Sequence, residues 1–97
     1  MSNMTGQFSE TKNATKEIQV ICDQVSVKHK VEKYPEFIAV KYREQIVAGQ
    51  NFIIKVHVGG VNYIHLSVFQ ALPCDGGQVV LRGVQEHKTE DDPLVPF

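Results

Sequence analysis

Three segments after Pro35 carry an apolar residue at every second position, and this pattern limits the possible folds more than any other feature. The apolar positions are Ile38, Val40, Tyr42, Phe52, Ile54, Val56, Val58, Ile64, Leu66 and Val68. Because successive side chains of a β-strand point to opposite faces, this spacing gives each strand one face to bury. The chain therefore predicts consecutive antiparallel strands that share an apolar face.

The apolar positions also predict how these strands pair. Pairing Val56 with Leu66 also sets Ile54 opposite Val68 and Val58 opposite Ile64, and the same test pairs Tyr42 with Phe52. This register places Val47 at the apex of the first hairpin. A turn-rich stretch at residues 73–77 then leads to a last strand around residues 79–85.

The segment before Pro35 has a helical period instead. Most of its apolar residues fall on one stripe, formed by Ala14, Ile18, Ile21, Cys22 and Val25, whereas Val20, Val27 and Val31 lie on the opposite face. Asn13 is the predicted N-cap, and Pro35 sets the far limit because the residue before a proline disfavours helical geometry. We therefore expect an amphipathic helix within residues 13–34.

One helix followed by an antiparallel meander predicts an α+β fold, in which a sheet of four to five strands curves around one long helix. The 97 residues suffice for a single domain. Within this domain we expect a flexible N-terminal segment at residues 1–12, the helix region at 13–34, the meander at 36–86 and a C-terminal tail at 87–97, of which residues 90–92 should be solvated.

Charge and composition argue against several classes of partner. The 10 Lys and Arg residues balance 11 Asp and Glu residues, which gives no net attraction to nucleic acid or to an anionic membrane. The apolar stretches are shorter than the ~20 residues of a membrane helix. The first residues do not form a secretory signal, and Cys22 and Cys74 are expected to stay reduced and unbridged, so we expect a cytoplasmic protein.

The predicted tip of the first hairpin has the composition of a loop that could enter a groove. Its residues are Gln45, Ile46, Val47, Ala48 and Gly49. Gly49 suits a positive backbone torsion and Ala48 is small enough for close approach to another surface. Turn chemistry alone favours a simpler interpretation, an ordinary hairpin turn with an exposed apolar residue.

These five residues resemble the Gln-x-Val-x-Gly signature of cystatins, the inhibitors of papain-like proteases. Residues 17–19, 55–59, 65–69 and 71–73 are similar to the stefin branch of that family, in order and spacing. The resemblance covers nearly the whole chain from Gly6 onward. Two departures are Cys74 after Pro73 and a stretch from Ile18 to Tyr34 that is shorter than in stefins by about one helical turn.

The resemblance implies a cystatin-like fold and a reversible, tight-binding, competitive inhibitor of papain-like cysteine proteases such as cathepsins. Its protease-binding wedge would consist of Gly6, of Gln45, Ile46, Val47, Ala48 and Gly49, and of Leu72 and Pro73. We expect no enzymatic activity, cofactor or metal, and no nucleic-acid or membrane partner. A monomer is expected, with a dimer formed by hairpin exchange as the alternative.

Two other functions stay open at this stage. The first is a non-inhibitory module on the same fold that binds another protein through an exposed sheet edge. The second is a small enzyme that uses Cys74, or a metal site at His57 and His65, which we expect to face each other across two strands on the polar side. No third metal ligand and no histidine beside Cys74 is placed by the sequence, which disfavours this reading.

Overall fold

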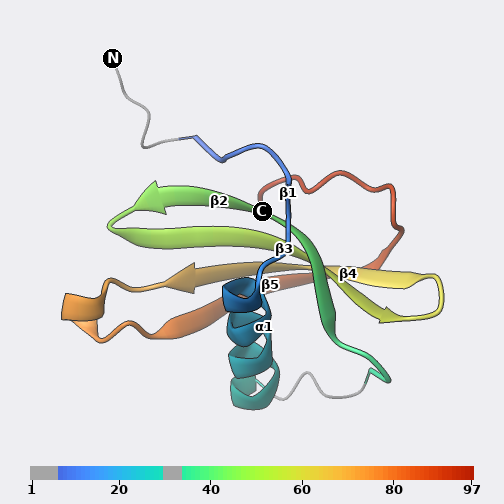
Figure 1. Cartoon of the computed structure of the whole chain (residues 1–97), viewed down its shortest axis with the longest axis horizontal. Coiled ribbons are helices and arrows are strands. Elements are labelled where there is room, and N and C mark those ends of the chain that lie inside the picture. Colours follow the sequence, from blue (N-terminus) through green and yellow to red (C-terminus); the bar gives the residue numbers. More distant parts are fainter. Residues whose placement is uncertain (1–6, 30–33) are drawn as a thin grey trace.

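The computed structural model describes residues 7–29 and 34–97 and has the α+β architecture expected from the sequence (Figure 1). The elements are β1 (Lys12–Asn13), α1 (Lys16–His29), β2 (Ile38–Val47), β3 (Gly49–Gly59), β4 (Asn62–Gln70), the 3-10 turn η2 (Pro73–Asp75) and β5 (Val79–Lys88). The strands form one antiparallel sheet in the order β1-β2-β3-β4-β5. No helix in the described part of the chain could span a membrane.

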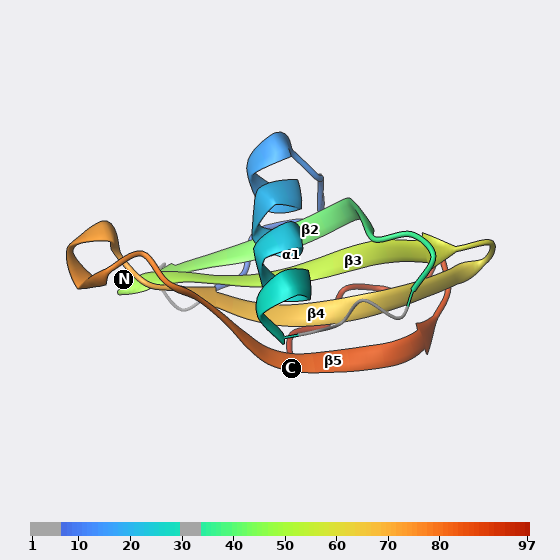
Figure 2. The same cartoon turned by 90° about the horizontal axis from the view of Figure 1, so that it is seen from below.

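Helix α1 runs across one face of the sheet, and its predicted apolar stripe forms one side of the core (Figure 2). Ile18, Ile21, Cys22 and Val25 are all buried. They pack against the apolar face of the sheet, which consists of Tyr42, Phe52, Ile54, Val56, Val58, Ile64, Leu66, Val68 and Val79. The two periods therefore identified most of the residues that meet in the core. The expectation fails at the start of β2, where the pairing shifts between Ala39 and Lys41, so that Ala39 packs against the core and Ile38 is 53% exposed.

The helix begins later than predicted. Asn13 belongs to β1, and the backbone N–H of Ala14 donates to the Val40 carbonyl at 2.9 Å, so the chain is still part of the sheet at this point. Thr15 takes the capping role, because its Oγ1 accepts a hydrogen bond from the Ile18 N–H at 3.3 Å. The prediction of Asn13 as the N-cap is therefore wrong, and residues 30–33 of the expected helix lie outside the described residues.

The strands pair in a different register from the predicted one. Ile54, and not Val56, lies opposite Leu66, and Tyr42 pairs with Ile54 instead of Phe52. Alternation has a period of two, so registers two residues apart bury the same face and the pattern cannot separate them. The lengths of the two turns decide between these registers.

The C-terminal segment covers the face of the sheet opposite the helix (Figure 1). Strand β5 ends at Lys88, and beyond it Leu94 is only 3% exposed. The buried Lys55 donates through its Nζ to the carbonyls of Glu90 at 2.6 Å and Asp92 at 2.7 Å. Glu90 and Asp91 are exposed, as expected for a solvated stretch. The segment is nevertheless not purely solvated, because it supplies backbone hydrogen-bond acceptors and the buried side chain of Leu94 to the outer face.

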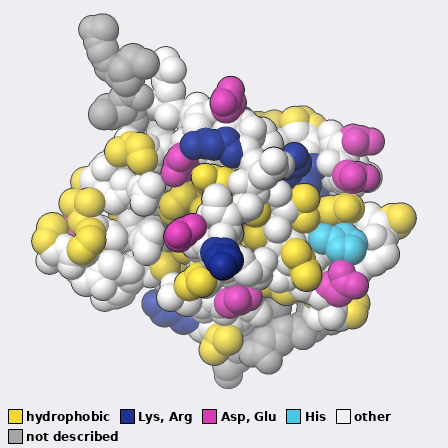
Figure 3. All heavy atoms as spheres, viewed as in Figure 1, with side chains coloured by type: hydrophobic (Ala, Val, Ile, Leu, Met, Phe, Trp, Pro, Cys, Tyr) yellow, Lys and Arg dark blue, Asp and Glu magenta, His cyan; other side chains and the backbone are white. Residues whose placement is uncertain are grey.

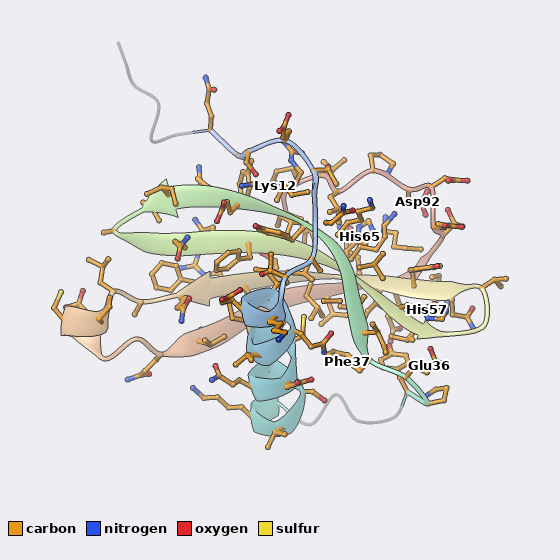
Figure 4. The ribbon with its side chains drawn as sticks, in the orientation of Figure 1. Lys12, Glu36, Phe37, His57, His65 and Asp92 are labelled. Atoms are coloured by element: carbon orange, nitrogen blue, oxygen red, sulfur yellow. The ribbon has the colours of Figure 1, made fainter. Side chains whose placement is uncertain are left out.

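The two histidines of the sheet do not form a pair. His57 lies opposite Tyr63, with 4.9 Å between the ring centroids, whereas His65 lies opposite Lys55. His65 is 1% exposed, between the sheet and the segment that carries Asp92 (Figure 4). Burial lowers the pKa of His65 to about 4. Within residues 7–29 and 34–97, no group of three metal-ligating side chains comes together.

Candidate functional site

Two loops project side by side from one end of the sheet (Figure 1). The first loop, residues 45–49, joins β2 to β3, and the second loop, residues 71–78, joins β4 to β5. They are neighbours because β3 pairs with both β2 and β4, with Gln50 opposite Gln70. A hollow of about 210 Å³ lies between them, lined by Gly49, Gln50, Gln70, Ala71, Leu72, Pro73 and Gly77. The structure thus brings both predicted loop sites together.

The first loop is a tight hairpin whose tip is Ala48. Val47 pairs with Gly49 at the end of the ladder, so the prediction that Val47 forms the apex is wrong by one residue. Ile46 is 53% exposed, Ala48 is exposed and Val47 is half-buried. The base of the loop is tied across the strands, because Asn51 Nδ2 donates to Gln45 Oε1 at 2.8 Å.

Gly49 seats the first loop on strand β4. Its φ of +110° is a torsion that side-chain-bearing residues rarely adopt. A Cβ atom on Gly49 would lie 2.5 Å from the carbonyl oxygen of Gln70 and 2.8 Å from the ring of Phe69. The sequence indicated the positive torsion, but the close approach to β4 follows only from the three-stranded pairing.

The second loop holds its apolar residues on a short, internally bonded turn. The carbonyl oxygen of Leu72 accepts hydrogen bonds from the N–H groups of Asp75 and Gly77, both at 2.9 Å. Pro73 begins the 3-10 turn and is exposed, and Leu72 is 38% exposed. Cys74 is also exposed, as expected for a thiol in this turn. The loop therefore presents an apolar tip whose backbone is already ordered.

The surface at the loop end suits contact with another molecule better than chemistry. Hydrophobic side chains gather at the left-hand end of the face in Figure 3, where the two loops project. Residues 45–49 include no titratable side chain, residues 71–78 include only Cys74 and Asp75, and neither loop contains a histidine. General acid-base catalysis needs such groups within hydrogen-bonding reach, whereas desolvated apolar tips favour binding in a cleft.

The N-terminal segment approaches the same end of the molecule. From β1, residues 7–11 lead back along β2 in the direction of the loops (Figure 1). The N–H of Ser9 donates to the carbonyl of Glu44 at 2.7 Å, and the salt bridge from Lys12 to Glu44 measures 2.6 Å. No sequence pattern indicated the contacts of Ser9. Gly6, the predicted contact residue of this segment, lies outside the described residues.

A second hollow, of about 690 Å³, lies at the opposite end of the sheet, near the β3–β4 turn. The carboxylates at its rim already have partners. Tyr34 donates to Glu86 at 2.6 Å, and His57 Nδ1 lies 2.9 Å from Glu36 (Figure 4). Burial, followed by the contact with Glu86, raises the pKa of Tyr34 to about 12. This hollow is separate from the two loops.

A model of the cystatin domain matches residues 6–91, and the chain belongs to the cystatin family. Relatives are similar along their whole length. Cystatin-B of Oplegnathus fasciatus is 44% identical over 101 residues, covering 100% of both chains. Leukocyte cysteine proteinase inhibitor 1 of Sus scrofa is 46% identical, covering 97% of this chain and 94% of that protein. Stefin-C of Bos taurus is 43% identical, covering 95% of this chain and 94% of the relative. The resemblance to the stefin branch is therefore confirmed.

Proposed function

We propose that this chain is a reversible, tight-binding, competitive inhibitor of papain-like cysteine proteases, with cathepsins among its targets. The two loops and the N-terminal segment would together occlude the active-site cleft. The observation that carries the proposal is the pair of ordered, apolar loops side by side at one end of the sheet. The relative from Sus scrofa that is named a cysteine proteinase inhibitor supports the target class.

The internal bonding of the second loop gives a reason why the chain would inhibit instead of being cleaved. A cysteine protease attacks a substrate carbonyl that lies extended in its cleft. The carbonyl of Leu72 instead accepts two hydrogen bonds within its own turn. The catalytic thiolate would be covered by the loops without being offered a carbonyl in the geometry of attack, and the complex would dissociate intact.

Tight binding would follow from loops that are ordered before the protease is met. Association costs about 0.5–1.5 kcal/mol for each rotamer-rich side chain that becomes fixed. Gly49 on β4 and the bonded turn at Leu72 have already fixed both loop backbones. The exposed side chains of Ile46, Ala48 and Leu72 could then be desolvated in the cleft without the further cost of ordering the loop backbones, and Gly6 would add main-chain contacts.

The proposed setting is the cytoplasm, and the proposed state is a monomer. Both cysteines are free, with Cys22 buried and Cys74 exposed. An exposed thiol persists in a reducing compartment, whereas oxidising compartments favour bridges. Size-exclusion chromatography with light scattering separates the monomer from a dimer formed by hairpin exchange, and fractionation of cells tests the location.

The decisive experiment places a carboxylate in the first loop. Val47→Asp should weaken the inhibition of papain at least about 100-fold, since an unpaired charge that leaves water costs several kcal/mol and each ~1.4 kcal/mol is a factor of ten. The matched control is Val61→Asp. Val61 is 84% exposed in the turn at the opposite end of the sheet, and its replacement should leave inhibition unchanged.

Thermal melting accompanies both titrations with papain. Both variants should melt within a few degrees of wild type, because exposed or half-buried loop positions contribute about 0.5 kcal/mol or less to stability. A Val47→Asp protein that melts normally and inhibits as well as wild type would remove the first loop from the binding surface. A wild-type protein that leaves papain fully active would remove the proposed function itself.

A further inference from the structure

Arg43 joins two segments that lie far apart in the sequence. Its Nε donates to the carbonyl of Ser9 at 2.8 Å, and its Nη1 donates to the carbonyl of Leu94 at 2.7 Å. Its guanidinium also lies over the ring of Phe8, with 5.8 Å from Cζ to the ring centroid. One side chain on β2 therefore contacts both the N-terminal and the C-terminal segment, two residues before Gln45 begins the first loop.

Ser9 is held on β2 from its other side as well. Its N–H donates to the carbonyl of Glu44 at 2.7 Å, and its Oγ accepts from the N–H of Glu44 at 3.1 Å. Arg43 contributes the charged donor of this cluster, and hydrogen bonds to charged groups contribute more to stability than neutral ones. Without Arg43, the carbonyl of Ser9 loses its donor and the remaining bonds must hold the segment alone.

The C-terminal segment keeps Arg43 in place. Leu94 is buried against the outer face of the sheet, and its carbonyl fixes one end of the planar guanidinium. The other end then faces Ser9. A guanidinium presents several donors in a rigid, planar fork, so its Nε and Nη1 hold these two carbonyls in a fixed orientation, whereas a lysine ammonium is a single nitrogen on a flexible stem.

We infer that Arg43 is a positioning residue for inhibition, which fixes the N-terminal segment beside the first loop with the C-terminal segment as its support. The inference rests on the proposed function, in which that segment is the third part of the wedge. When Ser9 is anchored, the chain before it starts from a fixed point close to the protease cleft. When Ser9 is released, the entropic cost of ordering the whole segment falls on the binding step and weakens the affinity.

The test replaces Arg43 by methionine, which keeps the apolar stem and removes every donor. Arg43→Met should weaken the inhibition constant for papain about tenfold, mainly through faster dissociation, and Arg43→Lys should lie between Arg43→Met and wild type. The matched control is Lys28→Met, because Lys28 also donates to one backbone carbonyl, that of Val79 at 3.2 Å, but does so from the helix. This control should inhibit as wild type does.

Hydrogen exchange separates positioning from general stability. In Arg43→Met, the amide of Ser9 should exchange faster, while the amide of Val56 in the central strand β3 should keep its wild-type rate. Arg43→Met protein that inhibits papain as well as wild type would overturn the inference. So would an equal rise in exchange at Ser9 and Val56, because the effect would then be global destabilisation.

The two proposals fail in different ways. If wild-type protein does not inhibit papain, the proposed function is wrong, and the exchange of Ser9 in Arg43→Met still reports whether Arg43 anchors the segment. If wild-type protein inhibits and Arg43→Met has lost nothing, the proposed function stands and the positioning role is wrong.

Discussion

Gly49→Ala tests whether the first loop contacts strand β4 at Gly49 as closely as the structure indicates. The substitution places a methyl group 2.5 Å from the Gln70 carbonyl and 2.8 Å from the ring of Phe69, at a φ of +110°. The unfavourable torsion costs about 1–3 kcal/mol and the overpacking about 1–3 kcal/mol. Because the carbonyl belongs to the paired strand β4, the loop has to move, and we expect a stability loss on the order of 3 kcal/mol.

Gly60→Ala provides a matched control on the same sheet. Gly60 also has a positive φ, +57°, but a Cβ atom there would meet nothing within 4 Å. The stability loss of Gly60→Ala should therefore come only from the unfavourable left-handed backbone conformation, which costs about 1–2 kcal/mol. Gly60 lies in the turn at the opposite end from the loops, so its replacement should leave inhibition unchanged.

Urea unfolding of the two variants measures the loss of stability, and titration with papain measures the change in the inhibition constant. Gly49→Ala should lose more stability than Gly60→Ala, and its inhibition constant should weaken at least about tenfold, which corresponds to ~1.4 kcal/mol. Equal stability losses in the two variants would refute the contact with β4. A larger loss for Gly49→Ala without any change in inhibition would show that the position of the first loop does not matter for binding.

Three further predictions concern the fold. Ile54→Asp should abolish folding, as judged by circular dichroism, because Ile54 is fully buried in the core. The folded-state pKa of His65, about 4, is below its ordinary value of 6.5, so the stability that it contributes should be full above pH 6.5 and fall as the pH drops toward 4. Urea unfolding at pH 7 and pH 4.5 should show this loss of stability, and His65→Phe should reduce the difference between the two pH values. An identical pH dependence of stability in wild type and His65→Phe would contradict the prediction. Reducing agent should leave the melting temperature unchanged, because Cys22 and Cys74 are free, and a reductant-dependent drop would indicate a bridge.

The sequence predicted which face of β3 and β4 packs against the helix, but missed how the strands pair and how β2 begins, where Ile38 is 53% exposed. Every apolar residue at the alternating positions from Phe52 to Val68 is in the core, because side chains two positions apart on a strand point to the same face of the sheet. Register depends on the turns as well. The tight turn at Ala48 moves the partner of Tyr42 from Phe52 to Ile54. This shift of two residues keeps the same side chains on the buried face, so the alternating pattern cannot reveal it.

At the candidate site, too, the features that depend on neighbouring residues could be predicted, whereas the contacts between distant segments could not. Residues 45–49 and Leu72-Pro73 were found because local turn chemistry and the family signature mark them. The anchor of Ser9 was missed because its partner Arg43 is 34 positions away and neither residue stands out in its own segment. The same is true of Leu94, whose burial depends on an outer face that alternation had assigned to solvent.

The bond between Arg43 and Leu94 spans 51 positions, which has a consequence for the order in which the protein is completed during synthesis. Strand β2 and the first loop leave the ribosome well before residue 94 does. Until then Arg43 lacks one of its two carbonyl partners and the outer face around His65 is uncovered. The β2–β3 hairpin is therefore complete in sequence long before Arg43 has both carbonyl partners, and the full anchoring of the N-terminal segment waits for residue 94.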